Sequence, residues 1–183
     1  MKDYIQLLRP SQWLKNLFVF LLLFFSGQLM TDVDCIVSTI AVFAAWCFAA
    51  SAIYCFNDIR DMNDDRLHPV KRHRPLASGA ISTAKAYIVM TCCLVAGLLF
   101  LLPVRGSGVL PVVLLYLLID LAYSLRLKHV ALLDVFILSA GFVLRILAGA
   151  FVSEVWISQW IVVMTFLLAL FLSFAKRRDD LVI

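Results

Sequence analysis

The chain has 183 residues, 63% of them hydrophobic, and its mean hydropathy is +0.98. Roughly half of the residues of a soluble globular domain are apolar, so this composition excludes an ordinary soluble domain. The net charge of +4 arises from basic residues dispersed over several polar segments, which argues against a nucleic-acid partner. We therefore expect a polytopic membrane protein.

Apolar runs of about 20 residues are long enough to cross a hydrocarbon core of roughly 30 Å. The chain contains about six such runs, of which the first and the fourth are short. They predict an all-α transmembrane helical bundle that forms one membrane-embedded domain over residues 1–183. The predicted spans are residues 14–29, 35–56, 84–103, 109–123, 130–151 and 156–175.

The basic residues predict the orientation of these spans. Because each span crosses the membrane, every second polar segment lies on the same side. All of the 16 Lys and Arg residues except Arg105 and Arg145 fall in the polar segments of one side. Cytoplasmic segments of membrane proteins carry an excess of Lys and Arg. Both termini and the polar segment at residues 57–83 are therefore expected to face the cytoplasm.

A dense cluster of acidic and basic residues, NDIRDMNDDRLHPVKRHRPLASG at residues 57–79, follows an uncharged apolar run. Charges at the edge of a lipid-soluble segment are costly, so the cluster predicts a functional site. Asp58, Asp61 and Asp65 have the spacing i, i+3, i+7, which would place three carboxylates on one helical face. Carboxylates held that close repel one another, so a cation is expected between them.

This acidic pattern suits Mg²⁺, which binds oxygen ligands and usually combines one or two carboxylates with substrate phosphates. We predict Asp58, Asp61 and Asp65 as metal ligands and catalytic residues, and the neighbouring polar residues as ligands of phosphate oxygens. The alternative is a cytoplasmic loop of self-neutralising salt bridges. The predicted substrate-binding residues of this segment are Asn57, Arg66, Lys71, Arg72 and Arg74.

NDIRDMNDD at residues 57–65 resembles the first Asp-rich motif of the UbiA-type superfamily of intramembrane prenyltransferases, and RHRPLASG at residues 72–79 resembles its continuation. Further segments, spread over nearly the whole chain, resemble the decaprenyl-phosphate phosphoribosyltransferase branch. They are LRPSQWLKN at 8–16, DRLHPVKR at 65–72, YSLRLKH at 123–129 with Leu133 and Asp134, GFVLRILAG at 141–149 and KRR at 176–178.

The resemblance implies transfer of 5-phosphoribose from phosphoribosyl diphosphate to a polyprenyl phosphate, with Mg²⁺ as cofactor and diphosphate as the leaving group. It also implies a bacterial-type plasma membrane as the location. The surplus of basic residues suits the additional 5-phosphate of this donor. The alternatives are an aromatic-acceptor prenyltransferase that uses a polyprenyl diphosphate, and an inactive partner subunit on the same scaffold.

The second cytoplasmic loop is expected to complete the site. Superfamily members often carry D-x-x-x-D here, whereas this chain has Ser124 four residues after Asp120. Asp134 is predicted to contact metal or donor instead, the alternative being a helix cap. Lys128 is predicted as a phosphate ligand, the alternative being a topological anchor, and Tyr123 as a further substrate contact.

Arg145 lies inside the fifth predicted span, where a charged side chain needs a partner. Asp134 precedes it by about three helical turns, so both could face one cavity. Two interpretations stay open for Arg145: a structural pair with an aspartate, and contact with a substrate phosphate.

The length of the chain bears on the fold that the resemblance implies, because the superfamily fold usually has about nine helices. We expect the C-terminal helices of that fold to be missing. The alternatives are that six helices suffice, or that two chains of a homo-oligomer complete one cavity.

Overall fold

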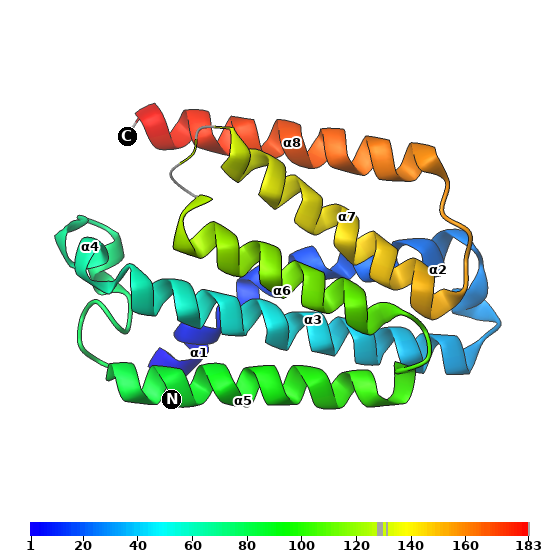
Figure 1. Ribbon diagram of the computed structural model, residues 1–183, viewed down its shortest axis with the longest axis horizontal. Coiled ribbons are helices and arrows are strands. Elements are labelled where there is room, and N and C mark those ends of the chain that lie inside the picture. Colours follow the sequence, from blue (N-terminus) through cyan, green and yellow to red (C-terminus); the bar gives the residue numbers. More distant parts are fainter. Residues whose placement is uncertain (128–129, 131, 183) are drawn as a thin grey trace.

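The computed structural model describes residues 1–127, 130 and 132–182, and it is an elongated bundle of helices (Figure 1). Helix α3 (Val33–Arg60) lies in the middle of the bundle. It contacts α5 (Thr83–Leu101), α6 (Val109–Leu125) and α7 (Leu133–Ser153), and α7 packs in turn against α8 (Gln159–Val182). The all-α fold expected from the sequence is confirmed.

The apolar helices have the lengths that a membrane requires. Val33–Arg60, Thr83–Val104 and Leu133–Ser153 are each long and apolar enough to cross a bilayer. Three shorter apolar helices, Pro10–Phe25, Val109–Leu125 and Gln159–Ala175, coincide with the remaining predicted spans. The chain is therefore an integral membrane protein.

The first apolar segment departs from regular α-helical geometry. Helix α1 (Lys2–Leu8) ends at Arg9, whose φ of 51° lies in the left-handed region, and a 3-10 helix, η1 (Pro10–Phe20), follows. Proline suits this first position because its missing N–H has no partner there in any case. Helix α2 (Leu21–Phe25) continues the segment.

Two partly buried hydrogen bonds join this segment to α3. Trp13 Nε1 donates to Ser51 Oγ at 3.0 Å, and Ser51 Oγ donates to the Leu8 carbonyl at 2.8 Å. One buried hydroxyl thus links α1, η1 and α3. The short elements between the main helices are η2 (Gln28–Met30), α4 (Met62–Leu67), η3 (Lys71–His73) and η4 (Leu102–Val104).

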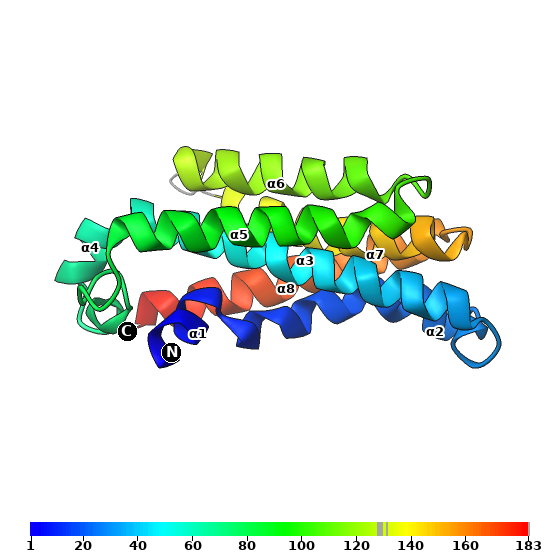
Figure 2. The same ribbon diagram turned by 90° about the horizontal axis from the view of Figure 1, so that it is seen from below.

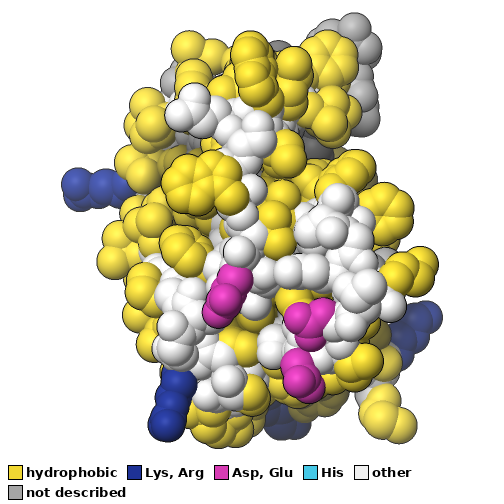
Figure 3. Space-filling view, turned by 90° about the vertical axis from the view of Figure 1, so that its right-hand side faces the viewer, with side chains coloured by type: hydrophobic (Ala, Val, Ile, Leu, Met, Phe, Trp, Pro, Cys, Tyr) yellow, Lys and Arg dark blue, Asp and Glu magenta, His cyan; other side chains and the backbone are white. Residues whose placement is uncertain are grey.

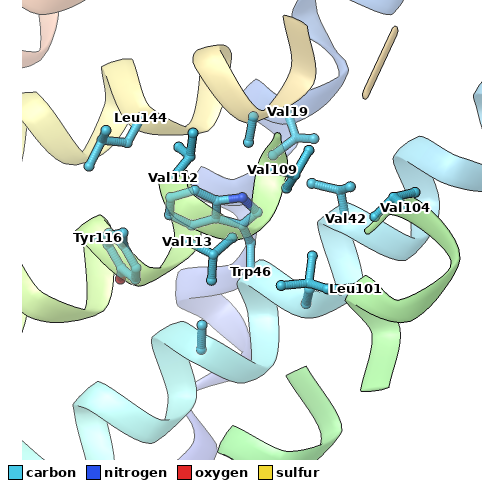
Figure 4. Packing of buried hydrophobic residues seen from close by; sticks show 13 residues of the cluster. Val19, Val42, Trp46, Leu101, Val104, Val109, Val112, Val113, Tyr116 and Leu144 are labelled. Carbon is cyan, nitrogen blue, oxygen red and sulfur yellow. The ribbon is translucent and has the colours of Figure 1, made fainter. Parts of the chain in front are cut away.

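The core is centred on Trp46 of α3, which is fully buried (Figure 4). Its ring centre lies 4.5 Å from that of Tyr116 on α6. A Cβ added to Gly149 of α7 would lie 2.1 Å from the carbonyl oxygen of Val19 on η1. These two elements therefore pack backbone against backbone, a contact that small residues permit between membrane helices.

The two ends of the bundle differ in charge. Both termini lie at the same end as α4 (Figures 1 and 2). The opposite end exposes the acidic residues Asp32, Asp34 and Glu154 (Figure 3). Asp32 also caps α3 by accepting a hydrogen bond from the Cys35 N–H at 2.9 Å.

Candidate active site

The acidic motif begins on α3 and continues past a kink. Helix α3 ends at Arg60, Asp61 has φ −92° and ψ 4°, and α4 starts at the next residue. The Asp61 N–H still bonds to the Asn57 carbonyl at 2.9 Å, and the Asp65 N–H bonds to the Asp61 carbonyl at 2.8 Å. The chain therefore bends at Asp61, and the uninterrupted helical face expected for the three aspartates is absent from this segment.

An arginine from the following loop joins two of these aspartates. Arg74 Nη1 lies 2.7 Å from Asp65 Oδ2 and 3.4 Å from Asp58 Oδ1. Asp58 also forms an ion pair with Arg9 Nη2. Both carboxylates are buried, with exposures of 2% for Asp58 and 4% for Asp65. The cation expected between the carboxylates is thus a guanidinium group in this structure.

Arg9 is a member of this cluster that sequence reasoning missed. It is 49 residues from Asp58, and the guanidinium also lies 5.1 Å from the ring centre of Tyr54. The available signal was the position of Arg9 in the segment LRPSQWLKN, directly before the proline that opens η1. Hydropathy patterns do not reveal pairing over such a separation.

Neighbouring residues of α3 face different spaces, because successive residues of a helix do not share a face. Asp58 lines an open groove together with Arg9 and Arg74. Asn57 lines a more enclosed cavity of about 100 Å³ between α3, α6, α7 and η1. The residues around this cavity are Lys15, Ile53, Tyr54, Asn57, Tyr116, Asp120, Tyr123, Ile137, Leu138, Gly141, Phe142 and Arg145.

Arg145 is 7% exposed, and the groups that it bonds to are neutral. Nε donates to Asn16 Oδ1 at 2.8 Å, and Nη1 donates to the Gly141 carbonyl at 2.6 Å. The guanidinium carbon lies 5.0 Å from the ring centres of both Trp46 and Tyr116. The sequence suggested an aspartate as structural partner, whereas the hydrogen-bond acceptors are an amide and a backbone carbonyl.

The other predicted residues are distributed around these two spaces. Arg66 Nε donates to the Ala77 carbonyl at 3.3 Å, whereas Lys71 and Arg72 are exposed on η3. Tyr123 lines the cavity, and Asp134 lies in the first turn of α7. Lys128 lies outside the described residues.

Ser124 replaces the second aspartate of the D-x-x-x-D pattern, and it is buried. Its hydroxyl donates to the Asp120 carbonyl at 2.7 Å, within α6. Asp120 itself reaches the cavity. Of the two positions of this pattern, Asp120 therefore contributes a carboxylate to the cavity, whereas the hydroxyl of Ser124 is bonded within α6.

The acidic side chains of residues 57–79 fit a divalent cation only in part. Over residues 1–127, 130 and 132–182, no three Asp, Glu, His or Cys side chains form a group that could hold a metal. Nevertheless, Asp58 and Asp65 are close enough to share one nitrogen atom of Arg74. Carboxylates that share one cationic atom fit a hard cation, which prefers oxygen ligands.

Comparison with known proteins identifies the family of this chain. The model of the UbiA prenyltransferase family matches residues 16–181. The chain belongs to this family. The family resemblance noted in the sequence is thereby confirmed.

Two curated UbiA relatives carry the same name. The chain is 36% identical over 180 residues to the decaprenyl-phosphate phosphoribosyltransferase of Mycolicibacterium smegmatis, covering 97% of this chain and 56% of the relative. It is 35% identical over 182 residues to that of Corynebacterium glutamicum, covering 98% and 54%. The chain spans about half the length of these relatives.

A solved structure supports the fold. A UbiA homolog from Archaeoglobus fulgidus, bound to GPP and Mg²⁺, superimposes with a TM-score of 0.77. The match is 24% identical in sequence and covers 92% of this chain and 60% of that chain. The helical bundle described above is therefore a UbiA fold.

Proposed function

We propose that this UbiA-family chain transfers 5-phosphoribose from phosphoribosyl diphosphate to a polyprenyl phosphate and releases diphosphate. The observation that carries the proposal is the charged cluster at one end of an apolar bundle, where buried Asp58 and Asp65 meet Arg74 beside exposed basic residues. Relatives named decaprenyl-phosphate phosphoribosyltransferase, similar over nearly the whole chain, support it.

The two reactants suit the charged end of the bundle and its apolar, membrane-facing helices. A phosphorylated sugar donor is soluble and requires cations, which Lys71 and Arg72 expose at the end of the bundle. A polyprenyl phosphate has an apolar tail, which requires contact with the membrane-facing helices. In the proposed orientation, this end faces the cytoplasm, as the distribution of Lys and Arg indicates.

Mg²⁺ would be held by Asp61 and Asp65 with Asp58, and when bound it supplies positive charge for the diphosphate leaving group. Both arginine contacts of Asp58 are made by Oδ1, so Oδ2 is the oxygen of Asp58 that would bind the ion. Arg74 contacts Asp58 and Asp65, and in this proposal its guanidinium binds diphosphate oxygens beside them.

The polyprenyl phosphate acceptor requires little chemical activation by the protein. A phosphate monoester is already anionic, so no strong general base is needed to activate its oxygen. The residues of the chain then act mainly by positioning the two reactants and by stabilising negative charge on the departing diphosphate. In this proposal Asn57 and Tyr123, which line the cavity, contact the donor.

The test is an assay in membranes that contain this chain, with labelled phosphoribosyl diphosphate and a polyprenyl phosphate. We expect label to enter the lipid in the presence of Mg²⁺ and not after chelation. Asp61→Asn should lower the rate by about 100-fold, because it removes a metal ligand. Asp64→Asn is the matched control: Asp64 is exposed in the same segment, and the change removes the same charge.

Three results would contradict the proposal. Labelling that survives chelation would exclude the role of Mg²⁺, and equal rates for the two variants would exclude that of Asp61. Turnover of a polyprenyl diphosphate with an aromatic acceptor, in place of the proposed pair, would identify an aromatic prenyltransferase.

A further inference from the structure

The enclosed cavity extends from the charged end of the bundle into the membrane region. Asn57, within one turn of the end of α3, lines it near that end. Arg145 lines it about three turns after the start of α7 at Leu133. The cavity therefore has an outer part beside the charged cluster and an inner part beside a buried guanidinium.

The inner guanidinium is held in a fixed orientation. Hydrogen bonds from Nε to Asn16 and from Nη1 to the Gly141 carbonyl restrain Arg145 from two sides. The guanidinium also lies over the rings of Trp46 and Tyr116. Such cation–π contacts offset part of the free-energy cost of removing the charge from water. An anion entering the cavity would meet a charge that is already oriented.

The nearest partners described for this charge are neutral groups. Within the described ranges, no carboxylate forms an ion pair with Arg145, and Asp120 of α6 interacts with it only as a more distant charge. A charged side chain that forms no close ion pair inside a membrane bundle is costly and typically marks a functional site. Lys15, on η1, adds a second cation to the same cavity wall.

We propose that Arg145 and Lys15 bind a phosphate monoester group in the inner part of the cavity. The inference rests on the proposed function, in which donor and acceptor each carry one such group: the 5-phosphate of the sugar and the phosphate of the lipid. Two cations suit a dianionic monoester better than a singly charged carboxylate. The planar fork of arginine also matches two oxygens of one phosphate.

The test is to add each probe in increasing concentration to the purified 183-residue chain in detergent. Binding is measured as the rise in the melting temperature of the chain. The probes are ribose 5-phosphate and a short-chain prenyl phosphate, with ribose and the prenyl alcohol as unphosphorylated controls. We expect at least one monoester to bind, and Arg145→Gln and Lys15→Gln each to weaken it about tenfold. Arg105→Gln, the same substitution at an exposed site, should leave binding unchanged.

The probe that depends on Arg145 identifies the source of the phosphate: ribose 5-phosphate indicates the donor, and prenyl phosphate the acceptor. If Arg145→Gln does not fold, Lys15→Gln decides alone, because Lys15 is exposed and its loss spares the core. Failure of both monoesters to bind the unchanged chain, or unchanged binding in the folded variants, would overturn the inference.

Binding is measured here without turnover, which separates this inference from the proposed function. Monoester binding that depends on Lys15 and Arg145, without phosphoribosyl transfer, would refute the proposed function alone. Transfer by Arg145→Gln and Lys15→Gln with unchanged KM for both substrates would refute the inference alone.

Discussion

Arg74 shows how one side chain organises the charged segment. Its Nη1 contacts Asp65 on α4 and Asp58 on α3, from a loop position 9 and 16 residues further along the chain. The side chain of Arg74 is 28% exposed, whereas both carboxylates are nearly buried. The arginine therefore compensates two charges that water reaches poorly.

Arg74→Ala should lower the free energy of unfolding by about 2–3 kcal/mol, because it leaves buried carboxylates with less compensation. Thermal unfolding in detergent measures the effect. Arg72→Ala is the control, because Arg72 is an exposed neighbour; its free energy of unfolding should stay close to that of the unchanged chain. Added Mg²⁺ should restore part of the stability of Arg74→Ala if the metal binds the same carboxylates. Equal losses in the two variants would contradict this assignment.

Among the elements, η1 and α7 pack backbone against backbone at Gly149. Gly149 allows the carbonyl of Val19 to approach where a Cβ would lie 2.1 Å away. The same two elements are joined by the hydrogen bond from Arg145 to Asn16. The position of η1 thus determines both the packing of α7 and the orientation of a cavity residue.

Gly149→Ala should destabilise the bundle by about 1–3 kcal/mol, because the added methyl forces two backbones apart. Gly106→Ala is the matched control: its added Cβ meets nothing within 4 Å, so we expect almost no change. Thermal unfolding of both purified variants distinguishes the two sites. An unchanged melting temperature for Gly149→Ala would contradict this prediction, because it would show that η1 and α7 can move apart without a loss of stability.

Hydropathy predicted the helices well, because a bilayer requires long apolar segments whose backbone groups are satisfied internally. The same reasoning could not predict the kink at Asp61 or the partners of Arg145. Asp61 occupies an i, i+3, i+7 pattern that a straight helix would share, and Asn16 lies 129 residues from Arg145. Such tertiary contacts leave no periodic signal. The roles assigned to Asp58, Asp61 and Asp65 in metal binding stay predictions.

For the whole molecule, the charge difference between the two ends predicts a single orientation in the membrane. Exposed basic residues follow α3, whereas Asp32, Asp34 and Glu154 are exposed at the other end (Figure 3). Asp64→Cys and Ser107→Cys place a thiol at each end of the bundle, in a background without the five native cysteines.

In intact cells, a membrane-impermeant maleimide should label Ser107→Cys and leave Asp64→Cys unlabelled, because the basic end is expected in the cytoplasm. Both should react after the membrane is permeabilised, which is the control for accessibility of the thiol. Labelling of Asp64→Cys in intact cells would reverse the orientation and place the charged cluster outside.

The 3-10 geometry of η1 has a consequence for the reach of the first span. A 3-10 helix rises about 2.0 Å per residue against about 1.5 Å in an α-helix, so η1 and α2 together extend about 30 Å. This distance matches the hydrocarbon thickness, although Pro10–Phe25 counts among the shorter apolar helices. If the 11 residues of η1 rewound into an α-helix, the span would shorten by about 5 Å. Such a contraction would draw Lys15 and Asn16 along the membrane normal relative to Arg145.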